Sequence, residues 1–176
     1  ITLRGQPLQR DAITERLWPA LGHEAAQRDF KVALNAMYRV LEPARAPESP
    51  SAYIARDGGT YWLRGEADIW IDALAFETEV SEALRALERC GPGAADFAGR
   101  VQALDVARAG YRGDYLPEAV YEDWSRSARE RLLGLYLRAG ERLAEARLAQ
   151  GQPEAALRAC EDIVARDACW EAAYRL

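Results

Sequence analysis

The chain has 176 residues, of which 49% are hydrophobic and 29% charged, an ordinary balance for one large or two small globular domains. No apolar run approaches the roughly 20 residues that span a bilayer, so we expect no membrane partner. Net charge is −5, divided into +1 for residues 1–66 and −6 for residues 67–176. This balance excludes a general nucleic-acid binder, so any DNA contact must come from a local cluster.

Cysteine and histidine are few. Three cysteines, Cys90, Cys160 and Cys169, lack metal-ligand spacing, and the only histidine is His23. We therefore expect no metal site and no small-molecule cofactor, and interpret the cysteines as small buried hydrophobes of a cytoplasmic protein. Because the chain begins at Ile1 and ends within a helical pattern, we also expect a fragment.

The first part of the chain predicts two helices and a hairpin. Residues 9–18, "QRDAITERLW", form a short amphipathic pattern, and residues 25–41 form a longer one. A proline-rich loop follows at 43–51. Strands are predicted at 52–56 and 60–64, because "DGG" between them supplies the positive backbone angles of a tight turn; "ADIWID", 67–72, predicts a third strand.

From residue 73 onward the pattern becomes entirely helical. Helices are predicted at 73–89, 94–109, 119–149 (as one helix or two), 153–166 and from 169. Short turns join them, which favours a stack of antiparallel helical hairpins. Ala155, Ala156, Ala159 and Ile163 form one stripe after a Gly-x-Pro turn, typical of helical-pair repeats of about 34 residues.

The helix at 25–41 has a hydrophobic stripe, and Phe30, Leu34, Met37 and Leu41 are predicted to face the core. The opposite face is positive and could be an ordinary solvated surface. The order of short helix, turn, long helix and hairpin is, however, that of a winged helix-turn-helix, whose second helix enters the major groove. The candidate DNA-binding residues are Gln27, Arg28, Lys31, Asn35, Tyr38, Arg39 and Arg56.

These candidates differ in their chemistry. Arginine and asparagine have forked groups that read guanine and adenine edges. Lys31 and Tyr38 suit phosphates, and Arg56 lies just before the hairpin tip, where it can reach the DNA backbone or minor groove.

The segments "QRDAITERLWP", "AAQRDFKVALNAMYRVLEP" and "YIARDGGTYWL" resemble the response-regulator class of winged helix. With "DIWIDALAFE", "YEDWSRSARERLLGLYLRAGERLAE", "GQPEAALRACEDIVARD" and, most specifically, "YRGDYLPE", the chain resembles proteins that carry the bacterial transcriptional activator domain. The resemblance implies a mostly α fold. It places a winged-helix head at 1–71 and a tetratricopeptide-like body at 72–176. Because only "ITLRGQPL" precedes the first helix of the head, we expect the head to lack its N-terminal part.

The implied function is transcription regulation, with promoter DNA bound by the head and RNA polymerase, a sensor domain or a second copy bound by the body. Family members often carry two adjacent basic residues near the end of the reading helix, whereas here Tyr38 precedes Arg39. Each lost phosphate contact lowers the salt slope of binding by about 0.9. The alternative is a protein-interaction scaffold whose head no longer binds DNA.

Catalysis has little support in the sequence. Asp114, Glu118, Glu122 and Asp123 include paired carboxylates, but no histidine or nucleophile pattern accompanies them. Turn chemistry explains this segment, with Asp114 as a helix or turn cap and Pro117 at a helix start. Trp124, Arg129 and Tyr136 are predicted to pack rather than to bind a ligand. We therefore expect a protein that is not an enzyme.

Overall fold

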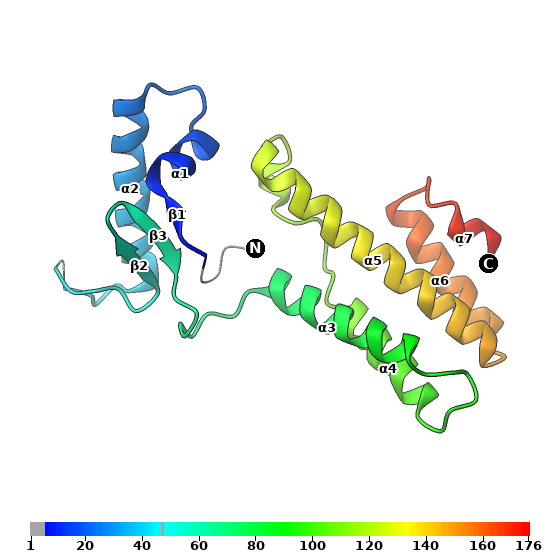
Figure 1. The fold of residues 1–176 in the computed structure, drawn as a ribbon. Coiled ribbons are helices and arrows are strands. Elements are labelled where there is room, and N and C mark those ends of the chain that lie inside the picture. The colour runs from blue at the N-terminus through cyan, green and yellow to red at the C-terminus, as the bar shows by residue number, and fades with distance from the viewer. Residues whose placement is uncertain (1–5, 47) are drawn as a thin grey trace. The chain divides into compact units, whose positions relative to one another are not determined.

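The computed structural model describes residues 6–46 and 48–176, so the predictions for residues 1–5 and for Pro47 lie outside it. The protein is mostly α-helical with one small antiparallel sheet (Figure 1), which confirms the predicted fold class. The chain divides into two compact units, Ile1–Trp70 and Ile71–Leu176. None of the described helices is long and apolar enough to cross a membrane.

The first unit combines two helices with three short strands. In chain order these are β1 (Leu8–Gln9), α1 (Arg10–Leu17), α2 (His23–Leu41), β2 (Ile54–Asp57) and β3 (Thr60–Leu63). The sheet order is β1-β3-β2, and both pairings are antiparallel. Gly58 and Gly59 have φ of 50° and 89°, so the hairpin turns where the sequence predicted it, at residues that tolerate this conformation.

The third strand predicted at 67–72 is wrong. The structure instead pairs Leu8 with Tyr61, so β1 occupies the edge of β3 that β2 leaves open. After β3 the chain turns, with the Ala67 amide donating to the Arg64 carbonyl at 3.2 Å. A strand needs a partner as well as an alternating pattern. Both edges of β3 are already taken.

The inward face of α2 is only partly the predicted one. Phe30 is buried and meets the Tyr61 ring edge-on, with 5.0 Å between centroids. Leu34 and Leu41 are half-buried. Met37 is 44% exposed, so its predicted core position is wrong. Which side of a helix is buried depends on the elements that pack against it, and the buried side of α2 does not include Met37.

The end of α2 is tied to the start of the hairpin by Glu42. Its carboxylate accepts hydrogen bonds from the Ser51 hydroxyl and from the Ala52 amide, the latter at 2.8 Å. Ser51 in turn accepts the Ile54 amide at 2.9 Å. The bond from Ser51, followed by that from Ala52, lowers the pKa of Glu42 below its ordinary value. These bonds favour the ionised carboxylate and hold the proline-rich loop closed.

We expect Glu42→Gln to destabilise the protein at neutral pH and to have little effect in acid. A lowered pKa contributes stability that is present above the unfolded value near 4.5 and is lost as pH falls through the folded value. The urea midpoint of variant and parent should therefore differ at about pH 7 and converge near pH 3. Glu48→Gln, on the same loop, is the control. An equal difference at both pH values would contradict this role.

The second unit is all-helical. It contains α3 (Asp72–Glu88), α4 (Phe97–Arg108), the 3₁₀ helix η1 (Pro117–Ala119), α5 (Asp123–Ala149), α6 (Pro153–Arg166) and α7 (Ala172–Arg175). The long α5 packs against α3, α4 and α6, as Figure 1 shows. The sequence left open whether one or two helices fill 119–149, and α5 is a single helix. Fully buried core residues include Val80, Val101, Leu104, Leu137 and Ile163.

Small residues let α5 and α6 approach closely. Of the predicted stripe on α6, Ala156, Ala159 and Ile163 are buried and Ala155 is half-buried. Gly151 has φ of 71° and Pro153 opens α6, so the predicted Gly-x-Pro turn forms. The cysteines are all free, but only Cys160 is buried, and the exposed Cys169 contradicts the prediction for that residue.

Candidate nucleic-acid interface

The outer face of α2 presents a row of polar and basic side chains. Arg28, Lys31, Asn35 and Arg39 are all exposed on this helix. Within the described ranges, the ion pairs of the protein do not include the three cations of this row. Their donors are therefore free to bind an external acceptor.

Gln27 lies at the edge of this face and is already engaged. It is half-buried, and its Nε2 donates to Asp11 Oδ1 of α1 at 2.8 Å. This bond bridges α1 and α2. Gln27 therefore helps to set the angle between the two helices, and its amide nitrogen is not free in this structure.

Tyr38, Asn35 and Arg56 come together in one place. They line a hollow of about 340 Å³ between α2, the loop after it and β2. Arg45 places its guanidinium 4.2 Å from the centre of the Tyr38 ring. Burial raises the pKa of Tyr38, while the positive charges of Arg56 and Arg45 act in the opposite direction. Tyr38 thus stays a neutral hydrogen-bonding group at neutral pH.

Two arginines that the sequence did not single out also line this hollow. Arg45 donates to the Ser49 carbonyl at 2.5 Å, and Arg64 donates from Nε to the Ser51 carbonyl at 3.0 Å. The Arg45 bond closes the loop on itself, and the Arg64 bond holds the loop to the hairpin. Both arginines add positive charge beside Arg56. Their position in or after a proline-rich loop carries no periodic signal, so only the folded loop identifies them.

The carboxylates considered for catalysis either make contacts within the protein or are exposed to solvent. Asp114 accepts a hydrogen bond from the Tyr111 hydroxyl at 3.0 Å within the turn. It caps no helix, so the helix-cap alternative is wrong. Pro117 does open the helix η1, as predicted. Asp123 pairs with Arg126 at 2.7 Å. In the described part of the chain, no group of histidine, cysteine or acidic residues is placed to hold a metal ion.

Arg129 and Tyr136 pack within the second unit, as expected, whereas Trp124 is 37% exposed and contradicts the prediction for that residue. Arg129 donates to the carbonyls of Tyr115, Val120 and Ala119 at 3.2, 3.2 and 2.9 Å. Tyr136 stacks on the Tyr111 ring with 4.8 Å between centroids. Both side chains are used to hold the segment that joins α4 to α5.

The protein thus joins a small unit with an open basic helix face to an all-helical body whose polar side chains stabilise its own loops. This arrangement is typical of a regulatory protein. Residues 71–176 match the model of the bacterial transcriptional activator domain. The match covers more than half of the chain, and the chain belongs to this family of bacterial transcriptional activators. Neither the comparison with curated proteins nor the comparison with solved structures gives a match.

Proposed function

We propose that the chain is part of a bacterial transcriptional activator whose first unit is a winged helix-turn-helix that binds promoter DNA. The outer face of α2 would enter the major groove, and the hairpin would lie along the adjacent backbone. The observation that carries the proposal is the row of exposed donors Arg28, Lys31, Asn35 and Arg39, free of internal ion pairs. The second unit would contact a protein: RNA polymerase, a sensor domain or a second copy.

The proposed roles follow from the geometry of each group. Arg28, Asn35 and Arg39 carry forked groups suited to base edges, each worth about 1–3 kcal/mol of discrimination when bidentate. Lys31 would hold a phosphate as a point charge. Tyr38 and Arg56 share one hollow, and there they would bind the backbone on the side of α2 that faces the hairpin. Gln27 would first have to release Asp11.

Mutations on the outer face of α2 should separate two effects, the loss of sequence preference and the loss of salt-dependent affinity. Arg28→Ala combined with Arg39→Ala should strongly reduce the preference for a duplex selected from a random library, since base contacts specify and only Asn35 of the three proposed base-reading residues remains. Lys31→Ala should weaken binding to every duplex alike and lower the salt slope by about 0.9. Fluorescence anisotropy with labelled duplexes over a range of salt concentrations measures both effects.

Arg138→Ala is the matched control, because Arg138 is exposed on α5 in the other unit. Its affinity for every duplex should equal that of the parent. If the parent chain binds duplexes but the double variant keeps the full sequence preference, α2 is not the reading helix.

A scaffold function is the second candidate. Gln27 is engaged by Asp11 and Tyr38 is covered by Arg45, so two of the seven proposed DNA-binding residues already have structural partners. In that case the first unit would serve only as a folded cap, and the helical unit would bind proteins. Absence of duplex binding by the parent chain at low salt would favour this function.

A further inference from the structure

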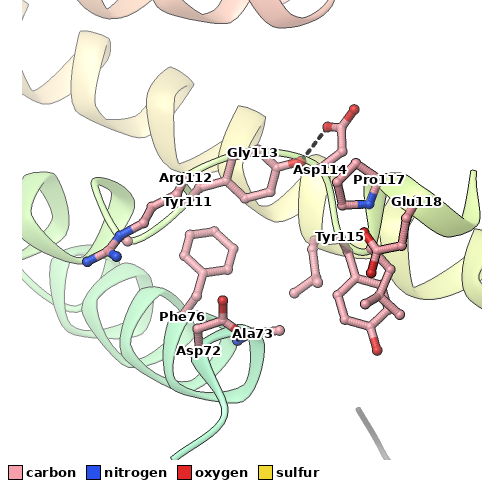
Figure 2. Close-up of a pocket in the computed structure, with 13 residues that line it drawn as sticks. Asp72, Ala73, Phe76, Tyr111, Arg112, Gly113, Asp114, Tyr115, Pro117 and Glu118 are labelled. Carbon is pink, nitrogen blue, oxygen red and sulfur yellow. Dashed lines mark hydrogen bonds between the residues drawn. The ribbon is translucent and has the colours of Figure 1, made fainter.

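The second unit contains a hollow that the proposed DNA contacts do not use. It measures about 560 Å³ and lies between the start of α3, the segment 110–118 and Leu132 of α5 (Figure 2). Phe76, Tyr111 and Tyr115 contribute aromatic surface to its walls. The hollow is therefore largely apolar inside.

One wall of the hollow is held in place by side-chain hydrogen bonds to the backbone, most of them part-buried. Arg129 binds three backbone carbonyls of segment 115–120. Ser125 is fully buried, and its hydroxyl lies 2.8 Å from the Ala119 carbonyl and 2.9 Å from that of Glu122. Little ordering is needed when a ligand binds to a wall built in this way, which favours affinity.

The charge at the hollow is negative. Figure 2 shows Asp72 beside Phe76 on the α3 side, and Tyr115 with Glu118 on the opposite side. Arg112 extends away from this group in the same view. Within the described ranges, the ion pairs include neither Asp72 nor Glu118. Two carboxylates therefore lack a cation across an aromatic cavity.

Asp72 and Tyr115 are close enough to interact electrostatically. Burial raises the pKa of Tyr115, and the negative charge of Asp72 raises it further. Asp72 also accepts the Ala73 amide at 2.7 Å, a bond that partly occupies one oxygen and leaves the other open. A cation entering here would meet a carboxylate and an aromatic ring together, the combination that favours guanidinium groups.

We propose that this pocket receives an arginine side chain of a partner protein, with its guanidinium between Asp72 and Glu118 and its methylenes against Phe76 and Tyr115. The inference deepens the protein-contact part of the proposed function and rests on it. Charge complementarity selects the cation, and the apolar walls select a residue with a long aliphatic stem.

Large exposed hydrophobic residues next to the pocket indicate that the occupant belongs to a protein. Val120, Tyr121 and Trp124 lie within six residues after Glu118 and are 48%, 94% and 37% exposed. Tyrosine and tryptophan are enriched where protein interfaces bury their central contacts. A free small cation would leave these side chains without a role, whereas a polypeptide that carries an arginine could cover them.

The test uses two short peptides and the whole chain. Acetyl-Leu-Arg-Leu-amide is titrated while the ring resonances of Phe76 and Tyr115 are followed by NMR, and the same peptide with citrulline in place of arginine is the neutral control. Because the two differ mainly in charge, the arginine peptide should bind about tenfold more tightly. Equal binding of the two peptides, or shifts confined to other residues, would overturn the proposal without any mutation.

A pair of double variants extends the test. The double variant Asp72→Asn, Glu118→Gln should bind the arginine peptide about tenfold more weakly. The double variant Glu79→Gln, Glu82→Gln makes the same charge change on exposed residues of α3 and should keep the parental affinity. Peptide binding should lower the pKa of Tyr115 in the parent, because a cation stabilises the phenolate. An unchanged pKa, or a loss of affinity in both double variants, contradicts the pocket.

This outcome is separable from that of the DNA proposal. The Asp72→Asn, Glu118→Gln variant should bind duplex DNA as the parent does, because neither residue lies in the first unit. If the peptide does not bind but the chain still binds duplex DNA, only the pocket proposal is refuted. If the chain binds the peptide but does not bind duplexes, only the proposed DNA binding is refuted.

Discussion

Gly140→Ala is expected to destabilise the second unit by about 1–3 kcal/mol, although alanine is the better helix former. Gly140 lies in the middle of α5, where α6 crosses it. A Cβ at this position would lie 2.8 Å from Cγ1 and 2.9 Å from Cδ1 of Ile163, and 3.0 Å from Nη2 of Arg108. Ile163 is fully buried, so it has no free space into which to move.

Gly134→Ala is the matched control on the same helix. Apart from its chain neighbours and the backbone of its own helix, no atom lies within 4 Å of where its Cβ would be. Here alanine only reduces the entropy of the unfolded chain, and we expect a gain of about 0.5–1 kcal/mol. Urea unfolding followed by helical circular dichroism measures both variants. The same sign for the two would show that α5 and α6 are not in close contact at Gly140.

Arg108→Ala is expected to cost about 2–4 kcal/mol, a large effect for a charged residue. The side chain is buried between α4, α5 and α6. Its guanidinium lies 4.1 Å from the centre of the Tyr136 ring, donates to the Tyr136 carbonyl at 3.4 Å and pairs with Asp162 at 3.3 Å. Removal leaves a cavity and loses all three contacts.

Asp162→Ala should cost less than about 1 kcal/mol, because the Asp162 side chain is 62% exposed and its charge remains hydrated. The contrast shows that packing of the guanidinium dominates over the ion pair. Equal losses in the two variants, measured by urea unfolding, would refute this. Because Gly140 and Arg108 are neighbours, the Arg108→Ala and Gly140→Ala effects should be less than additive when combined.

The fold class was predictable because the local patterns are strong. The helix at 153–166 was predicted with the boundaries that α6 has, since a Gly-x-Pro turn starts it and its apolar stripe has the helical period. The hairpin was predictable because the two glycines of "DGG" permit the positive φ that a tight turn requires. Both signals lie within a few residues of one another and need no distant partner.

The failures arose where a distant segment decides the structure. The predicted third strand at 67–72 does not form, and β1, a segment about 60 residues earlier in the chain, pairs with β3 instead. Met37 matched the apolar stripe, but no neighbouring element covers it in the first unit. Arg45 and the pocket around Tyr115 carried no sequence signal because their surroundings come from several elements.

Short motifs were enough to predict the family, and local periodicity and turn chemistry were enough to predict the longer helices, the hairpin and the basic row on α2. The edge strand β1 has no such local signal. Which of the candidate DNA-binding side chains are free depends on the packing of the folded chain. Folding pairs Gln27 with Asp11, brings Tyr38 and Arg56 to one hollow, and places both Asp72 and Glu118 in the lining of one aromatic cavity. Burial and charge pairing depend on residues far apart in the chain, and packing alone brings these together.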